Sequence, residues 1–154
     1  MNSYADTTYA DEYLSQMYGE QWTGIDMGKK QYALNHASLM IDLIPSIEGI
    51  KYKGHKTNPY QEAEFPRNIT GDEVPERVKQ AVCQEAMYIV SAEEDIKREQ
   101  AIRSGVRSKS AGSASESYAS ASELSGGIFK YLKSDIAVSL IAPYITYKGA
   151  YPIR

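Results

Sequence analysis

Four stretches of this chain repeat apolar residues at the three- and four-residue spacing of an α-helix, and this repetition constrains the fold more than any other feature. Apolar side chains at that spacing share one face of a helix and bury it against neighbouring helices. The sequence therefore predicts a mainly α fold, a small helical bundle of about four helices. The stretches run from Thr8 to Gly19, from Lys29 to Ile44, from Pro75 to about Asp95 and from Ile128 to Leu140.

Local signals predict where these helices begin and end. Thr8 and Asp11 form a candidate capping box, in which side chains satisfy free backbone N–H groups at a helix start. Pro45 and Pro143 are expected to end the second and fourth helices, because proline cannot donate a backbone hydrogen bond. Pro75 suits the first turn of the third helix, where that N–H group has no helical partner in any case.

Residues 45–74 interrupt the helical pattern with repeated glycine and proline. Only Ile50 and Tyr52 alternate as the residues of a strand do. A loop of this length inside a compact domain is uncommon and generally has a function. We expect a long, ordered loop whose task depends on its shape.

Two further segments contain few candidate core residues. Residues 104–125 are rich in serine, alanine and glycine, which is typical of a flexible linker. Tyr118 and the central Gly112 also allow a two-stranded hairpin that is ordered only against a neighbour. Residues 144–154 alternate tyrosine and isoleucine and fit a C-terminal arm. The prediction is one domain, residues 1–154, with a flexible or hairpin insertion and this arm.

Charge and cysteine content narrow the functional classes. The 154-residue chain has a formal net charge of −3 and a pI near 5.4, so binding to phosphate backbones requires a local basic patch. A single cysteine, Cys83, excludes an intramolecular disulfide and a zinc site of several thiolates, and suits a reducing compartment. No stretch approaches the roughly 20 apolar residues of a membrane span, so no membrane partner is expected.

No set of side chains indicates an enzyme. The chain contains no GxSxG, Walker A or GxGxxG sequence. His36 and His55 lack a second metal ligand at helical spacing; His36 is expected at the edge of the core and His55 in solvent. Cys83 has no neighbouring base and is expected to be a small buried hydrophobic residue. We therefore predict no catalytic activity, no cofactor and no metal site.

Two clusters of basic residues are the strongest candidates for a binding surface. Tyr52 and Tyr60 lie among the residues of the first cluster and could stack on unpaired bases. Glu48, Glu62 and Glu64 flank it, so a complementary protein surface explains it as well, and the overall acidity favours protein. Thirteen tyrosines against two phenylalanines also fit extensive protein interfaces. The clusters are Lys51, Lys53, His55 and Lys56, and then Lys97, Arg98, Arg103, Arg107 and Lys109.

The most specific pattern lies in the long loop. Residues 52–61 contain Gly54, Lys56, Pro59 and Gln61, and the sequence Phe65-Pro66-Arg67 follows. This arrangement resembles the G-x-K-x-x-P-x-Q and F-P-R pattern of head-tail connector proteins of tailed bacteriophages. Residues 9–13 and 74–83 resemble helix starts of the same family, and the matches together span most of residues 4–90. Some members of that family are described as DnaT-like single-stranded-DNA-binding proteins.

The resemblance implies a structural adaptor. Such a protein docks as a homo-oligomeric ring of about twelve copies beneath the portal protein, with DNA passing through its lumen. Its second partner is the stopper or tail-terminator protein, and its place is the neck of the virion, after assembly in the host cytoplasm. The expected function is therefore a head-tail adaptor that works by multivalent docking. The alternative is a single-stranded-DNA-binding protein that uses the loop around Tyr52 and Lys53.

The motif residues also have physical roles of their own. Gly54 permits a close approach or a backbone conformation denied to other residues. Phe65 can anchor the loop to the core, and Pro66 fixes the turn that presents Arg67. The aromatic-proline bond favours a cis peptide more than other bonds do, although trans is the more frequent state. Arg67 is expected to hold a carboxylate bidentately, within the fold rather than across subunits, which makes the loop a rigid latch. The candidate motif or interface residues are Tyr52, Gly54, Lys56, Pro59, Gln61, Phe65, Pro66, Arg67, Arg103, Arg107, Lys109 and Tyr118.

Overall fold

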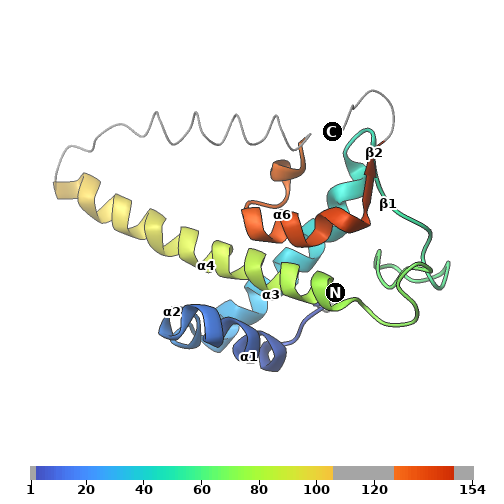
Figure 1. The fold of residues 1–154 in the computed structure, drawn as a ribbon. Helices are drawn as coiled ribbons and strands as arrows, with labels where there is room; N and C mark the ends of the chain where they lie inside the picture. The colour runs from blue at the N-terminus through green and yellow to red at the C-terminus, as the bar shows by residue number, and fades with distance from the viewer. Residues whose placement is uncertain (1–2, 106–126, 148–154) are drawn as a thin grey trace.

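The computed structural model describes residues 3–105 and 127–147, with the backbone alone for residues 94–105 and 147. Within these ranges the fold is mainly α, as the sequence predicts (Figure 1). Short 3-10 turns and a two-stranded sheet complete it. The elements are α1 (Thr7–Tyr18), α2 (Glu20–Thr23), α3 (Met27–Leu43), β1 (Ile50–Tyr52), α4 (Glu76–Gly105), α6 (Asp135–Ile141) and β2 (Ile145–Tyr147).

Helix α1 begins at Thr7, and its N-cap lies two residues before the predicted one. Its N-cap is Asp6, whose carboxylate accepts a hydrogen bond from the third helical N–H group at 2.8 Å. The predicted capping box of Thr8 and Asp11 is wrong, because Thr8 already lies inside the helix. The Asp11 carboxylate instead accepts hydrogen bonds from Trp22 Nε1 at 2.8 Å and from Lys30 Nζ at 3.0 Å. These two bonds join α1 to α2 and α3.

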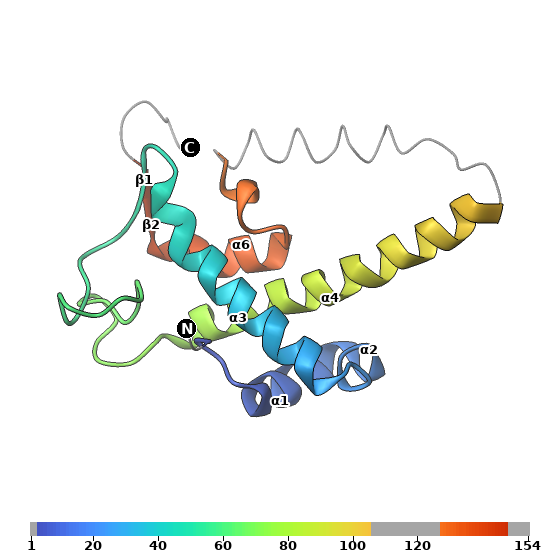
Figure 2. The same cartoon turned by 180° about the vertical axis from the view of Figure 1, so that it is seen from behind.

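Helices α3 and α4 cross at the centre of the fold (Figures 1 and 2). Helix α3 ends just before Pro45, as predicted, and the chain continues into the 3-10 turn Ile44–Ser46. The two helices meet through small and branched side chains, which allow close packing. The buried residues on these helices include Ala33, Leu34, Ala37, Ile41, Val78, Ala81, Val82 and Ala86.

Helix α4 is longer than predicted, since it ends at Gly105 rather than near Asp95. The prediction relied on the loss of apolar periodicity. However, residues 94–105 are mostly glutamate, lysine, arginine, glutamine and alanine, which favour a helix even without a buried face. The helix therefore continues until glycine is reached. Its last turns extend past the other described elements in both views (Figures 1 and 2).

The predicted fourth helix, Ile128 to Leu140, is divided in two. A 3-10 turn covers Ile128–Lys130, and α6 begins only at Asp135. Ser134 caps α6 by accepting a hydrogen bond from Ala137 N at 3.2 Å. The prediction that Ile136 lies on the buried apolar face is also wrong, because this residue is 44% exposed.

The small sheet joins the start of the long loop to the C-terminal side of the chain. Strands β1 and β2 are antiparallel, with Lys51 opposite Thr146. The strand-like alternation predicted at Ile50 and Tyr52 is confirmed, because both are buried while Lys51 between them is exposed.

Two predicted segments fall partly or wholly outside the described residues. Of the arm predicted at 144–154, Ile145–Tyr147 form β2 and pair with β1; residues 148–154 are not described, so the arm stays a prediction. The hairpin predicted at 104–125 is likewise outside the described ranges, except that residues 104 and 105 end α4. In the described ranges, no helix has both the length and the apolar character required to cross a bilayer.

Candidate functional site

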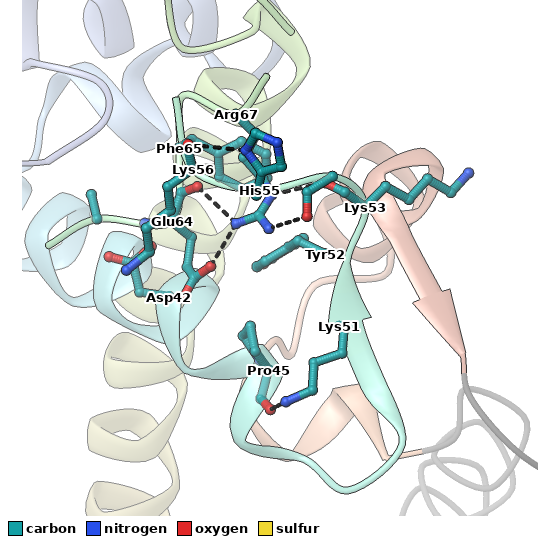
Figure 3. Close-up of polar contacts among 12 residues, drawn as sticks. Asp42, Pro45, Lys51, Tyr52, Lys53, His55, Lys56, Glu64, Phe65 and Arg67 are labelled. Atoms are coloured by element: carbon teal, nitrogen blue, oxygen red, sulfur yellow. Dashed lines mark hydrogen bonds and ion pairs between the residues drawn. The ribbon is translucent and has the colours of Figure 1, made fainter. Parts of the chain in front are cut away.

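A buried arginine organises residues 53–71 between β1 and α4, which we call the latch loop. Arg67 is 7% exposed. Its Nε donates to Lys53 O and its Nη2 to Gly54 O, both at 2.8 Å (Figure 3). Its Nη1 donates to Glu64 Oε1 at 2.8 Å and to Glu64 O at 3.2 Å. The predicted carboxylate partner within the fold is confirmed, but the pairing is not bidentate because the other donors bond to backbone carbonyls.

Phe65 anchors the latch loop in the core, as predicted. It is 2% exposed, and the peptide bond to Pro66 is cis. Its ring makes edge contacts with the rings of Tyr52, Tyr144 and Tyr4, at centroid distances of 4.8, 5.7 and 6.0 Å. One phenylalanine thus joins the loop to three parts of the sequence that lie far apart.

Tyr4 and Asp42 fix the same segment through hydrogen bonds. The Tyr4 hydroxyl donates to Asp42 Oδ1 and accepts from Phe65 N at 3.2 Å. The same Asp42 oxygen accepts from Glu64 N at 3.2 Å. Burial and then the neighbouring Asp42 carboxylate raise the pKa of Tyr4, and burial raises the pKa of Asp42. The sequence did not indicate Tyr4, because 61 positions separate it from Phe65.

Gly54 allows the two ends of the latch loop to close. Its φ is +73°, and a Cβ at this position would lie 2.3 Å from Asn68 Oδ1. That oxygen accepts a hydrogen bond from His55 N at 2.8 Å, and Asn68 N donates to His55 O at 2.8 Å. The predicted need for glycine is therefore confirmed, and Asn68 is a loop residue that the motif did not include.

The turn at residues 58–61 is held by its own side chains. Gln61 Oε1 accepts from Asn58 N at 3.1 Å, and Gln61 Nε2 donates to two loop carbonyls at 2.9 Å each. Asn58 Oδ1 accepts from Tyr60 N at 2.9 Å. Lys56 Nζ donates to Gln61 O at 3.3 Å. The structure thus brings the motif residues of the loop together, and their polar groups build the loop itself.

The two tyrosines of the first basic cluster have opposite environments. Tyr52 is 4% exposed, and its hydroxyl donates to Ile41 O at 2.6 Å. The prediction that Tyr52 stacks on bases is wrong, because its ring lies on the inward side of β1 against Phe65. Tyr60 is 92% exposed, so its ring is free to contact a ligand.

Cationic side chains lie on the outward side of the same region. Lys53 is exposed, and its ammonium points away from the loop in Figure 3 and has no hydrogen-bond or ion-pair partner among the described residues. Lys51 Nζ lies 3.5 Å from Pro45 O, and His55 is exposed. The latch loop also forms an open pocket of about 510 Å³, in which the carboxylate of Glu64 is paired with Arg67. The pocket is lined by His55, Lys56, Thr57, Pro59, Glu64 and Arg67.

The second basic cluster stays a prediction. Arg103 lies in α4, where only the backbone is described. Arg107 and Lys109 lie outside the described residues, as does Tyr118.

Helix α4 carries two buried titratable groups away from the latch loop. Cys83 is buried, as predicted, and burial raises the pKa of its thiol to about 12. Glu85 is 1% exposed and accepts hydrogen bonds from Lys133 N at 3.0 Å and Ser134 N at 2.9 Å. Burial raises the pKa of Glu85. In the part of the chain that the structure describes, no three His, Cys, Asp or Glu side chains gather as metal ligands would.

Comparison with known protein families assigns the chain to a family. A family model described as "Putative DnaT-like ssDNA binding protein" matches residues 1–151. The match includes every residue that the structure describes, the latch loop among them. No curated protein and no solved structure shows a significant match.

Proposed function

Because the chain belongs to the DnaT-like family, we propose that it binds single-stranded DNA through the exposed surface of the latch loop and β1. We call this surface the Tyr60 surface and define it as Tyr60, Lys51, Lys53 and His55. It replaces the site expected around Tyr52, whose ring is buried.

The observation that carries the proposal is the exposure of Tyr60. Its side chain is 92% exposed on a turn whose neighbouring side chains, Asn58 and Gln61, are occupied in holding the backbone. An exposed aromatic ring can gain free energy when it is buried against a ligand, and the turn already holds the backbone of Tyr60 in place. Such a ring suits stacking against a base, which contributes about 1–3 kcal/mol per base.

The cations supply the electrostatic part of the proposal. The formal net charge of −3 gives no general attraction to phosphate, so affinity depends on local cations. Lys51 lies in β1 and Lys53 directly follows it, and both side chains are exposed, with Lys51 Nζ 3.5 Å from Pro45 O. Each phosphate contact that they make adds a slope of about −0.7 to the dependence of log affinity on log salt.

Fluorescence anisotropy with a labelled oligothymidine at two salt concentrations tests the proposal. The wild type is expected to bind in a salt-sensitive manner, and Tyr60→Ala to weaken binding about 5- to 150-fold. Tyr60→Phe is the matched control, because it keeps the ring and should keep most of the affinity. Lys53→Ala should reduce both the affinity and the salt slope, whereas Lys130→Ala, an exposed lysine elsewhere, should change neither. Absence of salt-sensitive binding, or equal binding by Tyr60→Ala, would contradict the proposal.

A head-tail adaptor is the second candidate function. It is favoured by α4, whose last turns extend past the other described elements (Figures 1 and 2). Helices in proteins gain most of their stability from packing, so such an extension suits contact with a neighbouring subunit. In this role the chain would form a ring between the portal and the stopper or tail-terminator protein. Light scattering of the purified chain with and without its portal protein tests it, and portal-dependent assembly without DNA binding would favour this candidate over the first.

A further inference from the structure

Helix α3 carries a stripe of aromatic and leucine side chains on the side that faces away from the core. Tyr32, His36, Leu39 and Leu43, which we call the α3 seam, follow one another at spacings of four, three and four residues. Tyr32 is 60% exposed and Leu39 is 43% exposed, while His36 and Leu43 are half-buried. The rings of Tyr32 and His36 stack at a centroid distance of 5.8 Å. Spacings of four and three residues are those of the seam between two paired helices.

The opposite side of α3 already forms the core. Ala33, Leu34, Ala37 and Ile41 are fully buried there, packed mainly toward α4. The N-terminal segment contacts a third side through Ser38, whose hydroxyl accepts from Tyr4 N at 3.0 Å. Figure 2 shows α3 crossing the near side of the molecule with α4 behind it. Helix α3 is therefore apolar on two sides, and among the described elements only one of those sides is covered.

The charge pattern of α3 indicates what covers the second side. The eleven residues from Gln31 to Ile41 include no Asp, Glu, Lys or Arg. A helix that faces water normally carries charges on its outer side. A charged partner surface would leave its charges unpaired against this seam, which is costly once they lose water. The same stretch of a second copy brings no Asp, Glu, Lys or Arg to the contact. Two identical surfaces can pair about a twofold axis when each is complementary to the other, and two such stripes meet that condition.

We propose that the α3 seam pairs with the α3 seam of a second copy of this chain, to form a helix-helix interface. The core side of α3 is unchanged by this pairing, so the fold of each copy is the one described above. The proposal does not rest on DNA binding. Pairing through an apolar seam withstands salt, whereas binding to phosphate weakens with salt, so either can fail without the other.

Sedimentation equilibrium of the full chain at two salt concentrations tests the pairing. The wild type is expected to self-associate at both, and Leu39→Glu to raise the dissociation constant at least about tenfold. Ile69→Glu is the matched control, because Ile69 is 49% exposed and belongs to the latch loop rather than to α3, so this variant should associate as the wild type does. Circular dichroism checks that both variants keep their helices. A monomeric wild type at about 100 μM, or unchanged association of Leu39→Glu, would overturn the proposal.

Cysteine cross-linking tests the identity of the covering surface. Cys83 is buried, so a cysteine placed at position 32, 36, 39 or 43 is the accessible thiol among the described residues. In a twofold pairing, the position nearest the axis forms a disulfide between copies, which is expected for at least one of the four but not for Ile69→Cys. Association without a disulfide from any seam position would overturn the proposal, and would place the contact on another helix or on residues 106–126.

Discussion

Replacing Arg67 with methionine is the most direct test of the latch loop. Methionine keeps much of the length and apolar contact of the side chain but removes every hydrogen-bond donor. The carbonyl groups of Lys53 and Gly54 lose their side-chain donor, and the carboxylate of Glu64 loses its cation. The side chains of Arg67 and Glu64 are only 9% and 21% exposed, so water replaces these partners only in part.

The expected loss in the free energy of unfolding follows from the burial and hydrogen bonds of Arg67. Removal of one member of a buried, hydrogen-bonded ion pair costs about 3–5 kcal/mol, and the partial exposure of Glu64 places Arg67→Met near about 3 kcal/mol. With a urea m-value of about 2 kcal/mol/M, the unfolding midpoint should fall by about 1.5 M. Arg67→Lys should lose most of the same free energy, because one ammonium cannot donate in the three directions that the planar guanidinium reaches.

Equilibrium unfolding in urea measures this loss directly. Trp22 is the single tryptophan and is fully buried, so its fluorescence reports the transition. Lys53→Met is the control, because it removes an exposed cation of the same loop and should stay within about 0.5 kcal/mol of the wild type. If Arg67→Met also unfolds within about 0.5 kcal/mol of the wild type, Arg67 does not hold the loop and the reasoning is refuted.

A buried carboxyl, a buried thiol and a glycine give three further predictions. Burial raises the pKa of Glu85, so the folded chain keeps a proton that the unfolded chain releases near pH 4.5; its stabilising effect is greatest below that pH and is lost as pH rises through the raised pKa. The unfolding free energy of the wild type relative to Glu85→Gln should therefore fall between about pH 3 and about pH 7, and a rise would contradict this. Cys83 should react with a thiol reagent in urea but hardly in native buffer, where its pKa is about 12; equal rates would contradict its burial. Gly54→Ala should lower the unfolding free energy by at least about 1 kcal/mol more than Gly71→Ala, since both have positive φ but only the first Cβ meets Asn68.

The parts of the fold that the sequence predicted are those governed by neighbours along the chain. Helix α3 and the packed part of α4 follow from apolar spacing, and the end of α3 at Pro45 follows from the missing N–H group. The division of the fourth helix could not be predicted in this way. It depends on Glu85, which reaches from α4 to take the N–H groups of Lys133 and Ser134, a contact across 48 and 49 positions.

The burial of Tyr52 could have been predicted from the sequence. The alternation of Ile50, Lys51 and Tyr52 already placed Tyr52 on the same side as a buried isoleucine, which argues against stacking on a ligand. Tyr60 follows Pro59 in a turn, where no alternation applies, so its exposure had no comparable signal. The hydrogen bonds that join the Tyr4 hydroxyl to Asp42 and to Phe65 N could not be predicted, because no local sequence pattern links an N-terminal tyrosine to a distant loop.

The motif and the exposed surface of the latch loop carry separate information. The side chains at the fixed positions Lys56, Gln61 and Arg67 donate to carbonyl groups inside the loop. Tyr60 is the variable residue between Pro59 and Gln61, and the loop presents it to solvent. A chain that shares the motif is therefore expected to share the shape of the loop, whereas the residue at position 60 decides what the loop can bind. Tyr60→Ala should then abolish stacking on DNA, while its free energy of unfolding stays within about 0.5 kcal/mol of the wild type. Arg67→Met should lower the free energy of unfolding, while the molecules that remain folded keep their affinity for DNA.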